Sequence, residues 1–176
     1  MTLEQIENSK LDIGWDLGNK ILYDLCQNNF KHDTVEKIVA KTWLIGRSYS
    51  VALERRKNKI NNNEDFYLKT VVSAFKDSDL DNILKNLLKY DNISEDNLDE
   101  IIRTHRYLTK RLFEITELEK RSFSSKYLHF HLPQLFFIYD SRAVSAMRFY
   151  ESKLPNDIRS LAYNANYDKE YFLFFL

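Results

Sequence analysis

The chain has 176 residues, 44% of them hydrophobic, which is enough for one domain (1–176) or for two closely packed helical halves (1–93 and 94–176). Its 26 basic and 26 acidic residues cancel, which excludes tight non-specific nucleic-acid binding driven by net charge. With only three glycines and two prolines, a β fold with many tight turns is excluded as well, and we expect an all-α chain.

The first predicted helix covers residues 14–29, where apolar side chains recur at roughly helical spacing. Its expected core face consists of Trp15, Leu17, Leu22, Leu25 and Cys26. Because Cys26 is the single cysteine, the chain cannot form an internal disulfide.

A second helix is predicted over residues 33–58, with Asp33 or Thr34 as its cap. A wide apolar stripe extends along it to Leu53. We expect the helix to end in a surface loop around the three asparagines at 61–63.

Two shorter helices are predicted over 64–76 and 80–90. A long helix is predicted to begin at Ser94, because Ser94 and Asn97 are suitable capping residues and acidic side chains fill the first turns. Its apolar stripe continues to Ile115.

A short helix over 123–131 is followed by a proline and by an extended or irregular stretch at 136–139. Asp140 is then a strong N-cap for a helix over 141–151. Residues 155–176 contain a loop and a closing aromatic helix, whose apolar end we expect to pack into the core.

No apolar run reaches the length of a membrane span, and no signal peptide precedes the first polar residues. We therefore expect a cytoplasmic protein that does not contact a membrane. Two basic segments, 41–59 and 103–126, flank an acidic one, 77–100. They form one positive face if they meet in space, and otherwise they are solvated helix faces.

Lys126 is followed by several large apolar residues, and Asp140 lies 14 positions further along, after a proline turn. Burial disfavours a lysine ammonium, which lowers its pKa and frees the amine as a nucleophile. A lysine beside a carboxylate can open a glycosidic bond, because the carboxylate stabilises the developing sugar cation. In the alternative interpretation Asp140 only caps its helix, and Lys126 forms an ion pair or extends to solvent.

Residues 123–130 (FSSKYLHF) and 137–143 (FIYDSRA) resemble the catalytic region of the helix-hairpin-helix DNA glycosylase superfamily. The most similar members are compact bacterial proteins with the 8-oxoguanine DNA glycosylase (OGG) fold. The resemblance implies a compact all-α domain of that type. It implies base excision from DNA with Lys126 and Asp140 as the catalytic pair, abasic-site cleavage through a Schiff base, and no metal or cofactor.

The resemblance also implies a nucleic-acid partner, DNA rather than RNA, in DNA repair or in a multi-component bacterial defence system with a protein partner. The hairpin stretch 119–125 has no glycine, so phosphate contacts would come from side chains. The candidate nucleic-acid-binding residues are Arg121, Ser122, Ser124, Arg142, Arg47 and Arg55. The candidate base-pocket residues, each of which also suits a core position, are Trp43, Tyr49, Phe130 and His129.

The histidines do not predict a metal site. His129 and His131 are two residues apart on a helix and face different sides, His105 lies on an apolar stripe, and we expect His32 to be exposed near a cap. A helical ribonuclease using Arg121 and His129 is a rival interpretation, although seven intervening residues are too many for its usual pattern. A non-catalytic helical module that binds nucleic acid or protein is the other.

Overall fold

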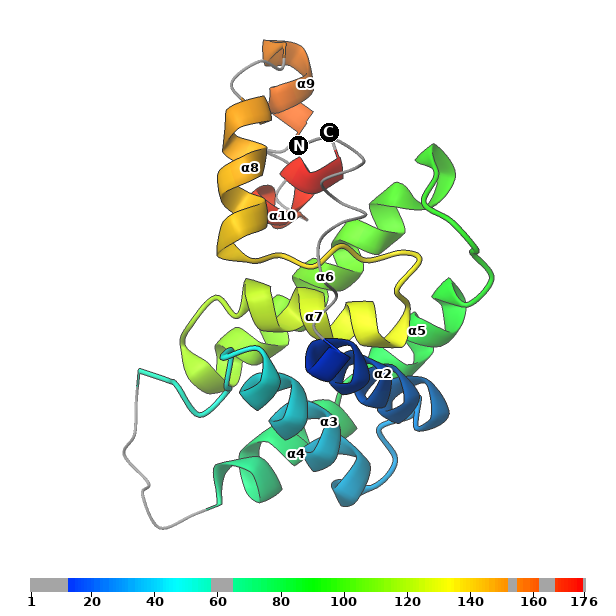
Figure 1. Ribbon diagram of the computed structural model, residues 1–176, viewed down its shortest axis with the longest axis vertical. Helices are drawn as coiled ribbons and strands as arrows, with labels where there is room; N and C mark the ends of the chain where they lie inside the picture. Colours follow the sequence, from blue (N-terminus) through cyan, green and yellow to red (C-terminus); the bar gives the residue numbers. More distant parts are fainter. Residues whose placement is uncertain (1–12, 58–64, 152–154, 162–166, 176) are drawn as a thin grey trace.

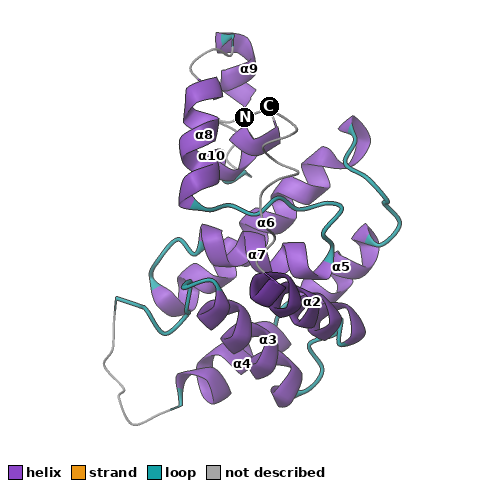
Figure 2. Cartoon of the chain, viewed as in Figure 1, coloured by secondary structure: helices purple, strands orange, loops and turns teal. Residues whose placement is uncertain are grey.

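The computed structural model describes residues 13–57, 65–151, 155–161 and 167–175. Within these ranges all regular structure is helical and there is no strand (Figures 1 and 2). The predicted all-α class is confirmed, whereas the glycosylase-type arrangement stays a prediction. The asparagine run at 61–63 lies outside the described residues.

The helices mostly follow the predicted ranges. They are α2 (Ile13–Asn28), α3 (Val35–Ser48), a π-helical segment η1 (Phe66–Val71), α4 (Val72–Lys76), α5 (Leu80–Leu87), α6 (Glu95–Thr116), α7 (Arg121–His131), α8 (Ser141–Glu151), α9 (Asn156–Leu161), α10 (Lys169–Phe172) and the 3-10 turn η2 (Leu173–Phe175). In the described part of the chain, no helix is both long and apolar enough to span a membrane.

The second helix is shorter than the sequence predicts: it ends at Ser48, not at residue 58. Ser50 adopts a left-handed conformation (φ 56°), which interrupts the helix. The chain then folds back so closely that a Cβ at Gly46 would lie 3.1 Å from the Cα of Ala52. The apolar residues that extend the predicted stripe are therefore buried from a loop and not from a helix.

Helix α7 lies at the centre of the molecule (Figure 1). It contacts α2, α3 and α6. Phe123, Tyr127, Leu128 and Phe130 are fully buried in the main core cluster. Because several elements surround α7, even its polar side chains are largely shielded from water.

The closing segment packs as predicted. Tyr171, Phe172 and Leu173 are buried, and the Tyr171 ring stacks on His105 with 3.6 Å between ring centroids. His105 is itself fully buried, in agreement with its predicted core position. Helices α8, α9 and α10 gather at one end of the molecule, beyond the end of α7 that carries Arg121 (Figure 1).

Two polar residues are buried where the sequence predicts exposure. His32 is 3% exposed and bonds to Asp81 and to the Tyr127 hydroxyl, both at 2.5 Å, so the prediction of an exposed His32 is wrong. Lys41, the first residue of the predicted basic segment 41–59, is fully buried beside His131. Their partners lie far away along the chain, which local sequence patterns do not reveal.

Candidate active site

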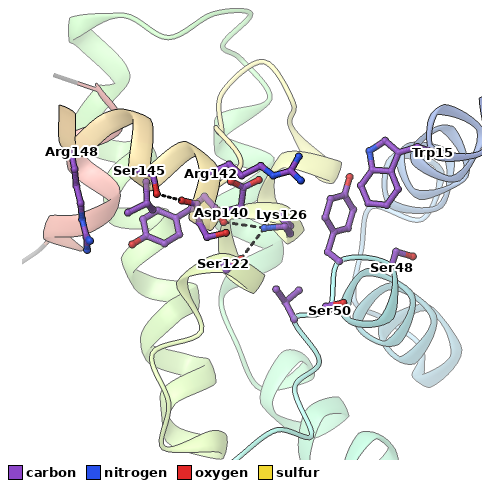
Figure 3. A pocket seen from close by; sticks show the side chains of 14 residues that line it. Trp15, Ser48, Ser50, Ser122, Lys126, Asp140, Arg142, Ser145 and Arg148 are labelled. Atoms are coloured by element: carbon purple, nitrogen blue, oxygen red, sulfur yellow. Dashed lines mark hydrogen bonds between the residues drawn. The ribbon is translucent and has the colours of Figure 1, made fainter. Parts of the chain in front are cut away.

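A pocket of about 950 Å³ opens where α7, the turn after α3, the start of α8 and the first turn of α2 come together (Figure 3). Its volume is in the range of small-molecule sites, about 300–1,000 Å³. The residues that line it are Trp15, Ser48, Tyr49, Ser50, Val51, Ser122, Lys126, Tyr139, Asp140, Ser141, Arg142, Val144, Ser145 and Arg148. Both predicted catalytic residues are among them.

The Lys126 amine is fixed by two acceptors on the pocket wall. It donates to the Ser122 hydroxyl, one helical turn earlier, at 2.8 Å and to the Tyr139 carbonyl at 3.0 Å. The Ser125 hydroxyl accepts from the Tyr139 backbone N–H at 2.9 Å. Adjacent side chains of α7 thus fix the returning segment that leads to Asp140.

Burial changes the protonation of this amine. Lys126 is 2% exposed, and desolvation lowers its pKa to about 8, while the negative charge of Asp140 acts in the opposite direction. The positive end of the side chain also lies 5.5 Å from the centre of the Tyr49 ring. The amine is therefore a stronger nucleophile near neutral pH than an ordinary lysine.

Asp140 is the N-cap of α8. One carboxylate oxygen accepts from the Ala143 backbone N–H at 2.8 Å. No ion pair joins Asp140 to Lys126 among the described residues, although the carboxylate is close enough to raise the pKa of the amine. The amine and the carboxylate therefore line the same pocket (Figure 3).

The predicted nucleic-acid-binding residues divide into two groups. Ser122 and Arg142 line the pocket, and Arg142 is exposed at its mouth. Arg121 instead pairs with the buried Asp168, from which its Nε is 2.7 Å, and Ser124 is fully buried. The structure does not bring these two residues into the pocket, because they lie on faces of α7 that pack against other parts of the chain.

Arg47 and Arg55 lie outside the pocket. Arg47 forms an ion pair with Glu54 and lies over the Trp43 ring, while Arg55 donates to the Ser50 carbonyl at 3.3 Å. Their loop reaches the second basic segment, because Lys120 donates to the Ala52 and Arg55 carbonyls. The two segments therefore meet, but acidic partners neutralise part of their positive charge.

Of the four predicted base-pocket residues, the structure brings only Tyr49 to the pocket. Trp43 lies on the outer face of α3, and Phe130 is fully buried in the core. His129 is bonded to the Tyr23 hydroxyl at 2.6 Å and to the Phe136 carbonyl at 2.7 Å. These three side chains have structural partners elsewhere.

Several lining residues were not predicted. The apolar spacing predicts Trp15 on the core face of its helix, but the side chain is 50% exposed and lines the pocket, so that prediction is wrong. Ser141, Ser145 and Arg148 reach the pocket from α8. The spacing of residues 141, 145 and 148 places them on one face of a helix, a pattern that the sequence contains.

Within the described residues, the structure assembles neither the ribonuclease pair nor a cluster of side chains that could hold a metal ion. Arg121 pairs with Asp168, and His129 bonds to Tyr23, so the proposed ribonuclease pair is not assembled. Among the described residues no cluster of three or more histidine, cysteine, aspartate or glutamate side chains could bind a metal ion.

Comparisons with protein-family models, with curated proteins and with solved structures gave no match to this chain.

Proposed function

We propose that this chain is a DNA N-glycosylase with abasic-site lyase activity, in which Lys126 is the nucleophile and Asp140 stabilises the sugar cation. The observation that carries the proposal is the shared pocket: an almost fully buried amine and a carboxylate face one space without forming an ion pair. The resemblance of residues 123–143 to the glycosylase catalytic region supports the same pair.

The lowered pKa supports the nucleophilic role. With a pKa of about 8, roughly a tenth of the Lys126 amines are neutral at pH 7, against fewer than about one in a thousand for an ordinary lysine. The neutral amine attacks C1′ of the deoxyribose while the N-glycosidic bond breaks. The base leaves with the bonding electrons and takes up a proton from water, while the Asp140 carboxylate stabilises positive charge on the sugar.

The lyase step follows from the same covalent bond. Loss of a proton from nitrogen and opening of the sugar ring give an iminium ion between Lys126 and C1′. Removal of a C2′ proton then forms a carbon–carbon double bond and expels the 3′ phosphate. Water hydrolyses the iminium and returns the free amine.

The substrate in this proposal is a nucleotide turned out of the DNA stack, because the reacting carbon must reach an amine that is 2% exposed. Arg142, exposed at the pocket mouth, suits a neighbouring phosphate. A cytoplasmic role in DNA repair or bacterial defence, alone or with a protein partner, is part of the proposal.

Borohydride trapping tests the proposal. Oligodeoxynucleotides that carry an oxidised guanine, another damaged base or an abasic site are incubated with the protein and borohydride, which reduces the iminium to a stable amine. We expect a covalent adduct on Lys126 that is lost in Lys126→Ala. Lys85→Ala, which removes an exposed lysine on α5, is the matched control and forms the adduct.

An adduct that persists in Lys126→Ala contradicts the assigned nucleophile. Binding of these DNAs without an adduct on any of them indicates the non-catalytic binding module instead. RNA cleavage that is lost in His129→Ala indicates the ribonuclease.

A further inference from the structure

The pocket has an aromatic wall opposite the start of α8. Trp15, from α2, is 50% exposed, and its ring lies edge-on to Tyr49 with 5.1 Å between centroids and 63° between the ring planes. Both residues line the same pocket as Lys126 and Asp140. A half-exposed indole that lines this pocket offers apolar surface to a ligand bound there.

The other aromatic rings of the pocket, those of Tyr49 and Tyr139, are less exposed than Trp15. The Tyr49 hydroxyl donates to Asn19 at 2.6 Å, and its ring lies near both Phe130 and the Lys126 amine. The Tyr139 ring packs on Phe174 at 5.2 Å. Of the three described aromatic residues that line the pocket, Trp15 is the most exposed, so its ring offers the largest accessible surface to a planar ligand.

Arg142 lies across the pocket from this wall. It extends from the first turn of α8 toward the side of the pocket that carries Trp15 (Figure 3). A planar guanidinium and an indole on opposite sides suit a flat, electron-rich ring between them. A nucleobase has such a ring, and aromatic side chains bind bases with little dependence on sequence, because every base has a π face.

We infer that Trp15 is the nucleobase-binding residue of this pocket, and that an unpaired base stacks on its indole while its sugar reaches Lys126 and Asp140. This inference rests on the proposed function, since it assigns the base side of the same site. It does not depend on the chemistry, because stacking can be measured without bond cleavage.

The chain provides its own control, because it has two tryptophans. Trp43 has a similar exposure, 43%, but it lies outside the pocket and the Arg47 guanidinium covers its ring at 5.5 Å. The Trp43→Phe variant leaves Trp15 as the sole tryptophan emitter. The Trp15→Phe variant leaves Trp43 alone.

The test is a fluorescence titration of both single-tryptophan variants. The ligands are a short single-stranded oligodeoxynucleotide with one guanine among thymines and the same strand with a tetrahydrofuran abasic analogue in place of the guanine. We expect the guanine strand to quench Trp15 emission more strongly than the analogue, and neither strand to quench Trp43 appreciably. Trp15→Ala should weaken binding of the guanine strand about tenfold in anisotropy measurements.

Equal quenching by the two strands, no quenching of Trp15, or equal effects on Trp15 and Trp43 would each overturn the assignment. Circular dichroism of each variant verifies folding before titration. Borohydride trapping is scored separately: quenching without trapping retains the base-binding role and rejects the catalytic one. Trapping without quenching retains the catalytic role and rejects the base-binding role of Trp15.

Discussion

Two buried lysines, Lys41 and Lys126, have similar burial and different surroundings. Both are at most 2% exposed, and desolvation lowers the pKa of each to about 8. The Lys41 amine donates to three successive carbonyls after α2, those of Asn29, Phe30 and Lys31, and contacts His131 at 3.3 Å. The Lys126 amine has two acceptors and faces a pocket.

The difference shows that burial alone does not identify a functional lysine. The acceptors around Lys41 use all the hydrogen atoms of its ammonium, and the residue connects the end of α2 to α7. A neutral Lys126 amine has two hydrogen atoms for its two acceptors, which leaves its lone pair for a substrate. We therefore assign a structural role to Lys41 and a chemical role to Lys126.

The largest expected effect is on stability. Lys41→Met removes a fully buried donor that serves three partly buried carbonyls, so we expect the free energy of unfolding to fall by about 3 kcal/mol. Lys126→Met leaves only two acceptors without their donor, and both lie at a pocket that water can enter. We expect this variant to change the free energy of unfolding by less than about 1 kcal/mol. Urea unfolding measures both, and equal losses would contradict the distinction.

The pH dependence of stability isolates Lys126 from Lys41. Between the folded-state pKa of about 8 and the ordinary lysine pKa of 10.5, the unfolded chain binds more protons at Lys126 than the folded chain does. The contribution of Lys126 to stability therefore rises with pH across this window and is constant outside it. We expect the wild type to gain stability relative to Lys126→Met from pH 8 to 10.5. A flat difference would mean that Lys126 titrates as an ordinary lysine.

Asp140 has a structural and an electrostatic role that two variants separate. Asp140→Ala removes the cap of α8 and should cost about 1 kcal/mol, whereas Asp140→Asn keeps a capping side chain and should cost less. Both variants remove the charge that raises the pKa of Lys126, so in both that pKa should fall further and borohydride trapping should be lost.

Thr34→Ala is the control for these variants, because Thr34 caps α3 in the same way. It should cost stability without changing the Lys126 pKa. Trapping at the wild-type level in Asp140→Asn would contradict a role for the carboxylate in the chemistry.

The smallest expected effect concerns Ser122. Its hydroxyl accepts from the Lys126 amine, which favours the charged form. Ser122→Ala should therefore lower the pKa of Lys126 by up to about one pH unit, while Ser122→Thr keeps the hydroxyl and should resemble the wild type. The pH profile of reductive methylation at Lys126 measures this change, and identical profiles for the alanine variant and the wild type would show that Ser122 does not position the amine.

Local patterns in the sequence predicted the helices well. The long helix α6 begins beside Ser94 as expected, where Ser94 and Asn97 form a capping box, and Asp140 caps α8 as expected. The predicted end of the second helix was wrong because apolar spacing continues past Ser48. The left-handed turn at Ser50 and the close approach at Gly46, which end the helix, depend on tertiary packing.

The site was predictable only in part, because local patterns reveal some of its residues and distant packing decides the others. Lys126 and Asp140 stand out because a polar group beside apolar bulk is chemically unusual. Arg121 and Ser124 looked equally suitable, but their roles depend on distant packing such as the ion pair with Asp168. The spacing of apolar residues along α2 also could not reveal that Trp15 lies at the pocket and not in the core.

The most direct test of the account is to label the folded protein with formaldehyde and cyanoborohydride over a range of pH and to measure methylation at each lysine by peptide mass spectrometry. We expect Lys126 to be modified with a midpoint near pH 8 and Lys41 to be protected until the protein unfolds. Protection of Lys126 equal to that of Lys41, or a midpoint for Lys126 near the ordinary lysine value of 10.5, would contradict the assignment of Lys126 as a reactive amine that faces an open pocket.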